Sequence, residues 1–349
     1  LTKYILKIMF SNKKTINKLF LYWLSISLIL VFSIIIVGGL TRLTNSGLSI
    51  TEWELIKGIL PPFTEKTWQD YFAEYKKIPQ YNLLNPNMSL NEFKVIFYWE
   101  YFHRFIARFI GLFFLIPLIY FYFTKKIKRN YLNVCFLIFS LIIFQGIIGW
   151  YMVQSGLVNN VSVSHYRLSI HLITAVAIIS IIYWLIKNIS SNNNKIFFKF
   201  SKKNIPYQLL ILLIFSQIVM GAFVSGLDAG QIYQTWPKMD NAYLPSDLSY
   251  NKFADLIEFN NHSLVQFYHR TLAYVIIAYS ILLTGNIIWK KIEYLYKPLG
   301  ILIIVLLLQA ILGILTLISA LNIYLASAHQ ITSVLLVFSA LNLYYFKAK

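Results

Sequence analysis

The chain has 349 residues, of which 58% are hydrophobic and 13% are charged, whereas an ordinary soluble domain carries about 25% charged residues. This composition excludes an ordinary soluble enzyme, and the single cysteine, Cys135, excludes both an intrachain disulfide and a site built from several thiolates. The net charge of +18 could indicate nucleic-acid binding, but the basic residues gather in alternate segments of the chain, as in membrane proteins. We therefore expect no nucleic-acid partner.

Apolar runs of roughly 20 residues, the length that crosses a bilayer as a helix, recur along the chain. The first run follows a basic segment, but it is longer than the core of a signal peptide and no small-residue cleavage site follows it. We predict an all-α integral membrane protein with eight transmembrane helices, arranged as two pseudo-symmetric four-helix bundles. The predicted spans lie near residues 20–41, 94–122, 131–153, 165–187, 206–226, 263–289, 297–320 and 324–346.

The segments between the predicted spans alternate in charge. Those on the side of the chain ends, with their flanking lysines, contain 19 Lys and Arg residues and one acid, and the others contain 7 Lys and Arg residues and 11 acids. This positive-inside bias predicts cytoplasmic termini and a multi-pass protein of the bacterial inner (plasma) membrane, surrounded by lipid. The predicted units are a cytoplasmic tail (1–19), a first four-helix half (20–187), a cytoplasmic linker (188–205) and a second four-helix half (206–346).

The predicted outer segment 42–93 contains two local patterns. Residues 64–77 carry aromatic side chains at helical spacing, which predicts a surface helix resting on the membrane interface. Ser89 and Glu92 have the spacing of a capping box, so the second span should begin above the membrane. We interpret this segment and 227–262 as a lid over the sites below. The aromatic residues are Trp68, Tyr71, Phe72 and Tyr75.

A four-helix unit occurs twice with the same orientation, which is a parallel repeat. His103 and Arg104 in the second span match His269 and Arg270 in the sixth, and His171 in the fourth span matches His329 in the eighth. The motif QGIIG at 145–149 likewise matches QAILG at 309–313. Four-helix bundles of this kind commonly hold haem or metal between their helices.

The four matched histidines share one depth, about six to nine residues into helices that enter from outside, or roughly 9–14 Å. A lone intramembrane histidine is more often a packed residue, but two symmetric pairs favour axial ligation of two haem irons. We therefore predict that His103, His171, His269 and His329 are metal ligands. His165 and His262 have no counterpart in the repeat, and we expect them to be solvated at the outer surface.

Arginines and glycines accompany these histidines. An arginine within a span is costly unless it is paired or snorkels to the headgroups, and haem propionates are anions that a guanidinium can bind. We favour propionate binding over snorkelling. The glycines at 38, 39, 146, 149, 221 and 313 could admit a flat macrocycle or serve ordinary helix packing. The arginines are Arg104, Arg108, Arg167 and Arg270.

One residue distinguishes the two halves. Glu100, one helical turn before His103, is the sole acid in any predicted span, and its counterpart before His269 is Gln266. An intramembrane carboxylate indicates function, here proton transfer in catalysis, although a structural hydrogen bond is the alternative. A di-iron carboxylate centre is excluded, because it needs two E-x-x-H motifs and further glutamates. Chemistry is therefore assigned to the first half and electron transfer or stability to the second.

Six motifs stand out along the chain: GGLTRLTNSGLSITEW (38–53), WEYFHR (99–104), VSHYRLSIHL (163–172), GAFVSGLDAG (221–230), WPKMDN (236–241) and VQFYHR (265–270). In these motifs the chain resembles the haem A synthase family, in the branch of proteobacteria and mitochondria. The resemblance extends from about residue 38 to 335. Ala107 departs from the glycine expected after the first His-Arg pair.

The resemblance implies oxidation of the C8 methyl group of haem O to the formyl group of haem A, for cytochrome oxidase. It implies that Glu100, His103 and His171 serve the substrate haem, and that His269 and His329 hold haem B. Haem O synthase and cytochrome oxidase assembly factors are the implied protein partners. The alternatives are a di-haem cytochrome that exchanges electrons with quinone, which gives Glu100 no special role, and a transporter, which no broken span supports.

Overall fold

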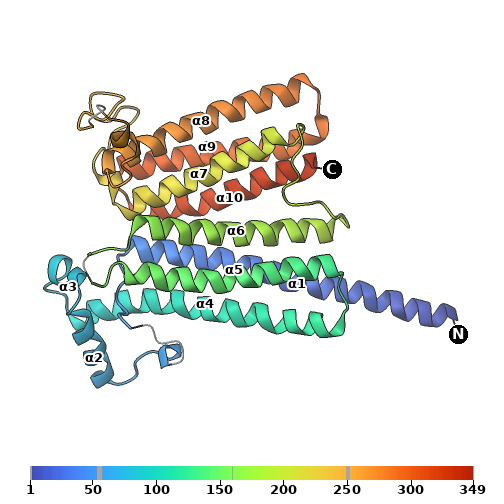
Figure 1. The fold of residues 1–349 in the computed structure, drawn as a ribbon, viewed down its shortest axis with the longest axis horizontal. Coiled ribbons are helices and arrows are strands. Elements are labelled where there is room, and N and C mark those ends of the chain that lie inside the picture. The colour runs from blue at the N-terminus through green and yellow to red at the C-terminus, as the bar shows by residue number, and fades with distance from the viewer. Residues whose placement is uncertain (1, 53–56, 159, 249–251, 349) are drawn as a thin grey trace.

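The structure is a computed structural model that describes residues 2–348 apart from 53–56, 159 and 249–251. Its ordered elements are helices, long and apolar in the bundle and short in the connecting segments (Figure 1). The bounds are α1 (Thr2–Leu43), α2 (Glu65–Tyr75), α3 (Pro79–Leu84), α4 (Leu90–Thr124), α5 (Arg129–Gln154), α6 (His165–Ser190), α7 (Ile205–Gly226), α8 (His262–Trp289), α9 (Tyr296–Ile318) and α10 (Ile323–Lys347), with 3₁₀ turns at Lys57–Ile59, Ala229–Gln231, Phe253–Ile257 and Glu293–Leu295.

Eight of these helices are long and apolar enough to cross a membrane, which confirms the all-helical membrane prediction. Their positions agree with the predicted spans, with two differences. Helix α1 begins at Thr2, so the predicted cytoplasmic tail is a helical continuation of the first span. Helix α4 runs through 35 residues, longer than predicted, because its capping box starts it at Leu90.

The helices pack as two neighbouring groups (Figure 1). Helices α1, α4, α5 and α6 contact one another, as do α7, α8, α9 and α10, and α6 against α7 and α1 against α10 join the groups. Both chain ends lie at one end of the bundle, opposite α2 and α3 (Figure 1). We call that opposite end, with segments 44–89 and 227–261, the loop end. The predicted pseudo-symmetry between the two groups stays a prediction.

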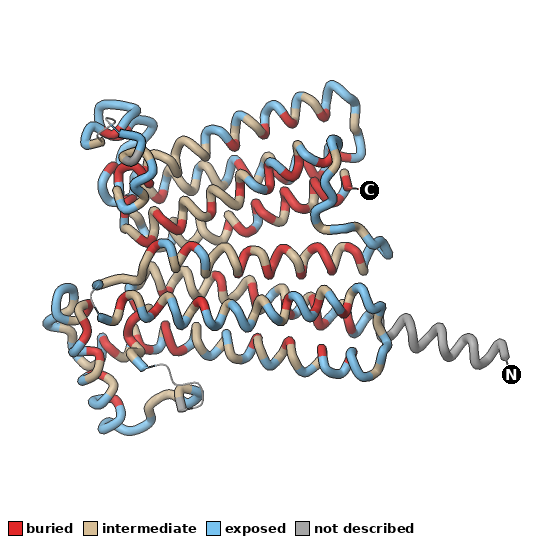
Figure 2. Tube along the Cα trace, viewed as in Figure 1, coloured by how far each residue is buried: buried red, intermediate tan, exposed pale blue. Residues whose placement is uncertain are grey.

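Each group has its own apolar core. Phe114, Ile138 and Ile179 are buried in the first, and Ile287 and Leu302 in the second. Many other apolar side chains face outward, so that buried and exposed positions alternate along the helices (Figure 2). An outward apolar surface of this extent suits contact with lipid and not with water.

The aromatic stripe of α2 does not rest on the membrane, and that prediction was wrong. Trp68 and Phe72 are buried against the loop-end turns of α4, with ring centroids 5.0 Å from Phe97 and 5.0 Å from Phe93. Because α4 extends beyond the bundle, it offers α2 an aromatic face inside the protein. Periodicity alone cannot distinguish that partner from lipid.

The capping box that begins α4 is formed as predicted. The Ser89 hydroxyl accepts a hydrogen bond from the Glu92 amide at 3.3 Å, and the Glu92 carboxylate accepts one from the Ser89 amide at 2.8 Å. Both bonds satisfy amides that the first helical turn leaves without partners. They set the start of the helix that carries Glu100 and His103.

The prediction that His165 and His262 are solvated is confirmed for His262, which is exposed, and wrong for His165. His165 is only 7% exposed, and its ring lies 5.2 Å from the Phe223 ring. Helices α6 and α7 meet closely here, because a Cβ on Gly226 would lie 2.6 Å from the His165 Cβ. His165 therefore packs in the seam between the two helix groups.

Candidate haem sites

His103 on α4 and His171 on α6 face each other in the first helix group. Their ring centroids lie 6.4 Å apart, with the ring planes inclined by 65°. Two imidazoles bound to one metal at about 2.0–2.1 Å, with each centroid roughly 1.1 Å beyond its nitrogen, are separated by about 6 Å. The His103–His171 pair therefore has the spacing that two axial ligands of one haem iron require.

Each of the four predicted ligands faces a glycine on a neighbouring helix. A Cβ on Gly38 of α1 would lie 3.0 Å from the His103 ring, and one on Gly149 of α5 would lie 3.1 Å from the His171 ring. In the second group the corresponding distances are 3.2 Å from Gly221 to His269 and 2.8 Å from Gly313 to His329. These glycines make room for the imidazole rings where neighbouring helices pack closely, so they serve both helix packing and the predicted sites.

The other two glycines do not share this role. Gly39 lies against the carboxamide of Gln330 on α10, which also donates a hydrogen bond to the Ile35 carbonyl of α1 at 3.0 Å. Gly146 has no neighbouring atom within 4 Å of a Cβ placed on it. Gln330 follows His329 directly in the sequence. Its contact therefore joins α10, next to one predicted ligand, to α1, close to Gly38.

Glu100 is buried, with 2% of its surface exposed, and three groups bind its carboxylate. One oxygen lies 2.6 Å from the Arg104 guanidinium. The other accepts hydrogen bonds from the Ser49 hydroxyl at 2.8 Å and the Ile50 amide at 2.9 Å. A buried carboxylate is stable only when paired and hydrogen-bonded, and these donors meet that requirement. Glu100 thus joins the helix of His103 to the outer segment.

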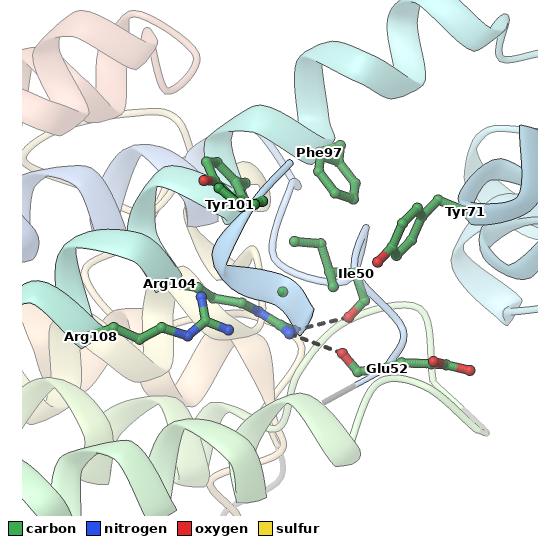
Figure 3. A pocket seen from close by; sticks show the side chains of 9 residues that line it. Ile50, Glu52, Tyr71, Phe97, Tyr101, Arg104 and Arg108 are labelled. Carbon is green, nitrogen blue, oxygen red and sulfur yellow. Dashed lines mark hydrogen bonds between the residues drawn. The ribbon is translucent and has the colours of Figure 1, made fainter. Parts of the chain in front are cut away.

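Arg104 completes the same connection. Its guanidinium donates to the Ile50 carbonyl at 2.9 Å and the Glu52 carbonyl at 3.2 Å, as the dashed lines in Figure 3 show. Arg108 lies beside it in a cavity that Ile50 and Tyr101 also line (Figure 3). Two guanidinium groups from successive turns of α4 therefore face one cavity beneath the outer segment.

The remaining predicted arginines also bind backbone carbonyls of the protein. Arg167 donates to Tyr151 O at 2.6 Å and stacks on the Tyr151 ring at 3.7 Å. Arg270 donates to Tyr233 O at 2.8 Å and Lys238 O at 3.2 Å. Arg104, Arg167 and Arg270 thus hold the loop end together, a role that neither propionate binding nor snorkelling anticipated. Composition shows an arginine in a span but not which carbonyl the fold brings to it.

In each group, two side chains of one helix bind the outer segment, and we call these contacts the clamp. In the second group the two side chains are those of Gln266 and Arg270, so this clamp contains no acid. Gln266, buried at 2% exposure, donates to Tyr233 O at 2.9 Å, the carbonyl that Arg270 also binds. His269 lies one turn beyond Gln266 on α8, as His103 lies one turn beyond Glu100 on α4. The structure thus brings His103 and His171 together, and it places His269 below an outer segment that Gln266 and Arg270 bind.

Comparison with known proteins assigns the chain to a family. The family described as COX15-CtaA, cytochrome oxidase assembly protein, matches residues 21–341. The chain belongs to this family. A protein of Pelagibacter ubique named haem A synthase is 48% identical over 333 residues, which cover 95% of this chain and 97% of that protein. Family members of the same name from Rickettsia africae and Rickettsia bellii are each 42% identical, over 90% of this chain and 94% of theirs.

Proposed function

We propose that this chain is a haem A synthase, an enzyme that oxidises the C8 methyl group of haem O to the formyl group of haem A. The observation that carries the proposal is the 48% identity over 95% of the chain to a protein of that name. A buried carboxylate one turn from a histidine pair with ligand spacing supports it independently. The names of the relatives do not support the di-haem cytochrome alternative.

We assign the substrate to the first helix group, with His103 and His171 as ligands of the haem O iron. Converting a methyl to a formyl group is a four-electron oxidation in which one oxygen atom replaces two hydrogen atoms of the methyl group, and an oxidant from outside the chain is reduced. Two hydroxylations give first an alcohol and then a gem-diol, which loses water. The three donors hold the Glu100 carboxylate group in place. A carboxylate held in this way can stabilise positive charge that develops at the methyl carbon and can receive protons released from it.

We assign the resident cofactor to the second group, where His269 and His329 would hold haem B. Bis-imidazole haem B, when bound, supplies one-electron transfer. The polypeptide supplies two imidazoles on α8 and α10 and the space that Gly221 and Gly313 leave beside them. Because Gln266 is uncharged, this half lacks the carboxylate that the oxidation uses.

We further propose that the loop end faces the outside of the bacterial inner membrane and that both termini are cytoplasmic. The distribution of Lys and Arg supports this orientation. Residues 20–187 and 206–346 would then be the substrate half and the haem B half. Arg104, Arg108, Arg167 and Arg270 supply positive charge at the loop end, where propionates would lie. Haem O synthase and cytochrome oxidase assembly factors are the proposed protein partners.

The test is expression in a bacterial host that makes haem O but no haem A. Haems extracted from the membranes and from the purified protein are separated by chromatography. We expect haem A only when this chain is expressed, together with haem B in the purified protein. A purified, haem-loaded protein that leaves haem O unchanged in this host would contradict the proposed function.

A further inference from the structure

The glycines that face histidines have a second common feature in three of the four cases. A glutamine stands four residues earlier in Gln145–Gly149 of α5, Gln217–Gly221 of α7 and Gln309–Gly313 of α9. Residues four apart lie on one helix face, so each glutamine points toward the same histidine as its glycine does. In α1 the residue four before Gly38 is Ile34, which can neither donate nor accept a hydrogen bond.

The glutamine carboxamides contact the histidines directly. The Gln145 Nε2 donates to the His171 carbonyl at 2.9 Å, and the Gln217 Nε2 donates to the His269 carbonyl at 3.0 Å. The same Gln217 Nε2 lies 3.2 Å from the His269 Nδ1. The two bonds to backbone carbonyls hold α6 against α5 and α8 against α7, beside the predicted ligands His171 and His269.

The third glutamine makes a related contact in α9. Its Nε2 lies 3.4 Å from the His329 Nε2, and the Gln309 backbone carbonyl lies 3.2 Å from the His329 Nδ1. Gln309 therefore contacts both nitrogens of the ring, one through its side chain and one through its backbone. Glutamines of the adjacent helices thus contact the rings of His269 and His329 and the backbone carbonyl of His171.

Each of these carboxamides also has an oxygen acceptor that makes no hydrogen bond. The Oε1 atoms of Gln145, Gln217 and Gln309 are buried and have no hydrogen-bond partner among the described residues. A histidine that binds metal through one ring nitrogen usually donates the other N–H to an oxygen acceptor, which fixes the ring orientation. Three buried oxygens beside three proposed ligands are acceptors of the kind that a ligating imidazole needs.

Among the described residues, neither the His103 ring nor the His171 ring has a hydrogen bond, and the buried His171 Nδ1 has no partner. His171 nevertheless has the unpartnered Gln145 Oε1 on the adjacent helix, whereas the His103 ring rests against Gly38, four residues after Ile34. An imidazole with no acceptor beside it loses less when it turns away from a metal than one whose second N–H can be bonded. His103 also lies one turn from Glu100 on the same face of α4.

We propose that Gln145, Gln217 and Gln309 are positioning residues for three axial ligands, and that His103 is the exchangeable ligand of the substrate site. This inference rests on the proposed function, since a substrate haem must enter and its product must leave. A resident haem with two held ligands stays, whereas a substrate haem with one held ligand can be released. The exchangeable position then opens on the side of the proposed catalytic carboxylate.

The test uses carbon monoxide, which binds reduced haem iron only where an axial ligand can be displaced. The full-length protein is purified with its haems, reduced, and mixed with CO in a stopped-flow spectrometer. We expect rapid CO binding at the substrate haem and little at haem B. Ile34→Gln, which introduces the missing glutamine, should slow CO binding about 10–100-fold, the usual range for an outer-shell partner of a metal ligand. Ile34→Leu is the control for packing.

The converse variant removes a glutamine from the haem B site. Gln217→Ile should make haem B bind CO, whereas Gln217→Glu, which keeps an acceptor, should not. Unchanged CO binding in both Ile34→Gln and Gln217→Ile would overturn the inference, as would equal effects of Gln217→Ile and Gln217→Glu. These spectra report on ligand exchange and do not depend on conversion of haem O. A protein that binds both haems but forms no haem A therefore contradicts the proposed function alone.

Discussion

The two helix groups hold their outer segments with the same side-chain positions but with the charge in different places. In the first, the acid is on the helix, and Glu100 binds Ser49 and Ile50 of the outer segment. In the second, the helix supplies Gln266, and the acid is on the segment, where Asp247 accepts hydrogen bonds from Ser263 at 2.7 Å and Tyr233 at 2.6 Å.

Binding of the outer segment and a buried charge on the helix are separate features of the two groups. Arg104 and Arg270 each bind a carbonyl of an outer segment, so the clamp itself does not need a carboxylate on the helix. A charge buried among apolar helices acts through a lower dielectric than one at a surface, and its field at a neighbouring ligand is stronger. Because its acid stands on the helix and not on the outer segment, the first half has a group that can act on a bound substrate.

The largest expected effect comes from removing ligands in one half at a time. His269→Ala or His329→Ala should abolish the low-spin haem B spectrum, because one imidazole cannot keep the iron six-coordinate. His103→Ala or His171→Ala should leave that spectrum in place and lower the content of haem O and haem A. Optical spectra and haem chromatography of the purified variants distinguish the halves. Loss of haem B from the His103→Ala variant would refute the assignment of one haem to each half.

The next effect concerns the acid that only one half has on its helix. Glu100→Gln gives the first half the residue of the second, and we expect haem A formation to fall about 10²–10⁴-fold, the range for loss of an acid–base group. The haem B spectrum should persist, and haem O or its alcohol should accumulate. Glu74→Gln, at a partly exposed acid of α2, is the matched control. Normal haem A output from Glu100→Gln would leave Glu100 only the structural hydrogen bonds.

A smaller effect is expected at the helix starts. Ser89 caps α4 with a reciprocal box, whereas Asn261 caps α8 through a single bond to the Leu264 amide at 3.0 Å. Ser89→Ala and Asn261→Ala should each lower stability by about 0.5–2 kcal/mol. We expect Ser89→Ala to have the larger effect, since it also removes the bond that the Ser89 hydroxyl donates to the Glu92 carboxylate at 2.8 Å. Thermal unfolding in detergent measures both, and equal shifts would show that the box adds nothing to the cap.

The smallest effect is a pH dependence of the second outer segment. Burial raises the pKa of Asp247, but the hydrogen bonds from Ser263 and Tyr233 outweigh it and hold that pKa below its ordinary value of 3.8. A lowered pKa in the folded state means that this stabilisation is present above pH 3.8 and is lost as pH falls further. Hydrogen exchange in 227–261 should rise there in wild type. Asp247→Asn should remove the dependence, and an unchanged slope would contradict it.

The sequence by itself determined the eight spans and the matched positions of the four histidines in the repeat, because hydrophobic length and residue order are local properties of the chain. It also determined the start of α4, since a capping box is complete within four residues. The difference between Glu100 and Gln266 was visible from the repeat alone. Family membership followed from motifs that extend over most of the chain.

Only the tertiary structure decided which groups meet. That the α2 stripe packs on α4, that His165 is buried between α6 and α7, and that Ser49 binds Glu100 depend on segments distant in sequence. The role of Gln217 was missed because its neighbour, His269, lies 52 residues away, and only the packing of α7 on α8 brings them together. Side-chain partners across helices depend on rotation and tilt, which small residues such as Gly221 permit and periodicity does not encode.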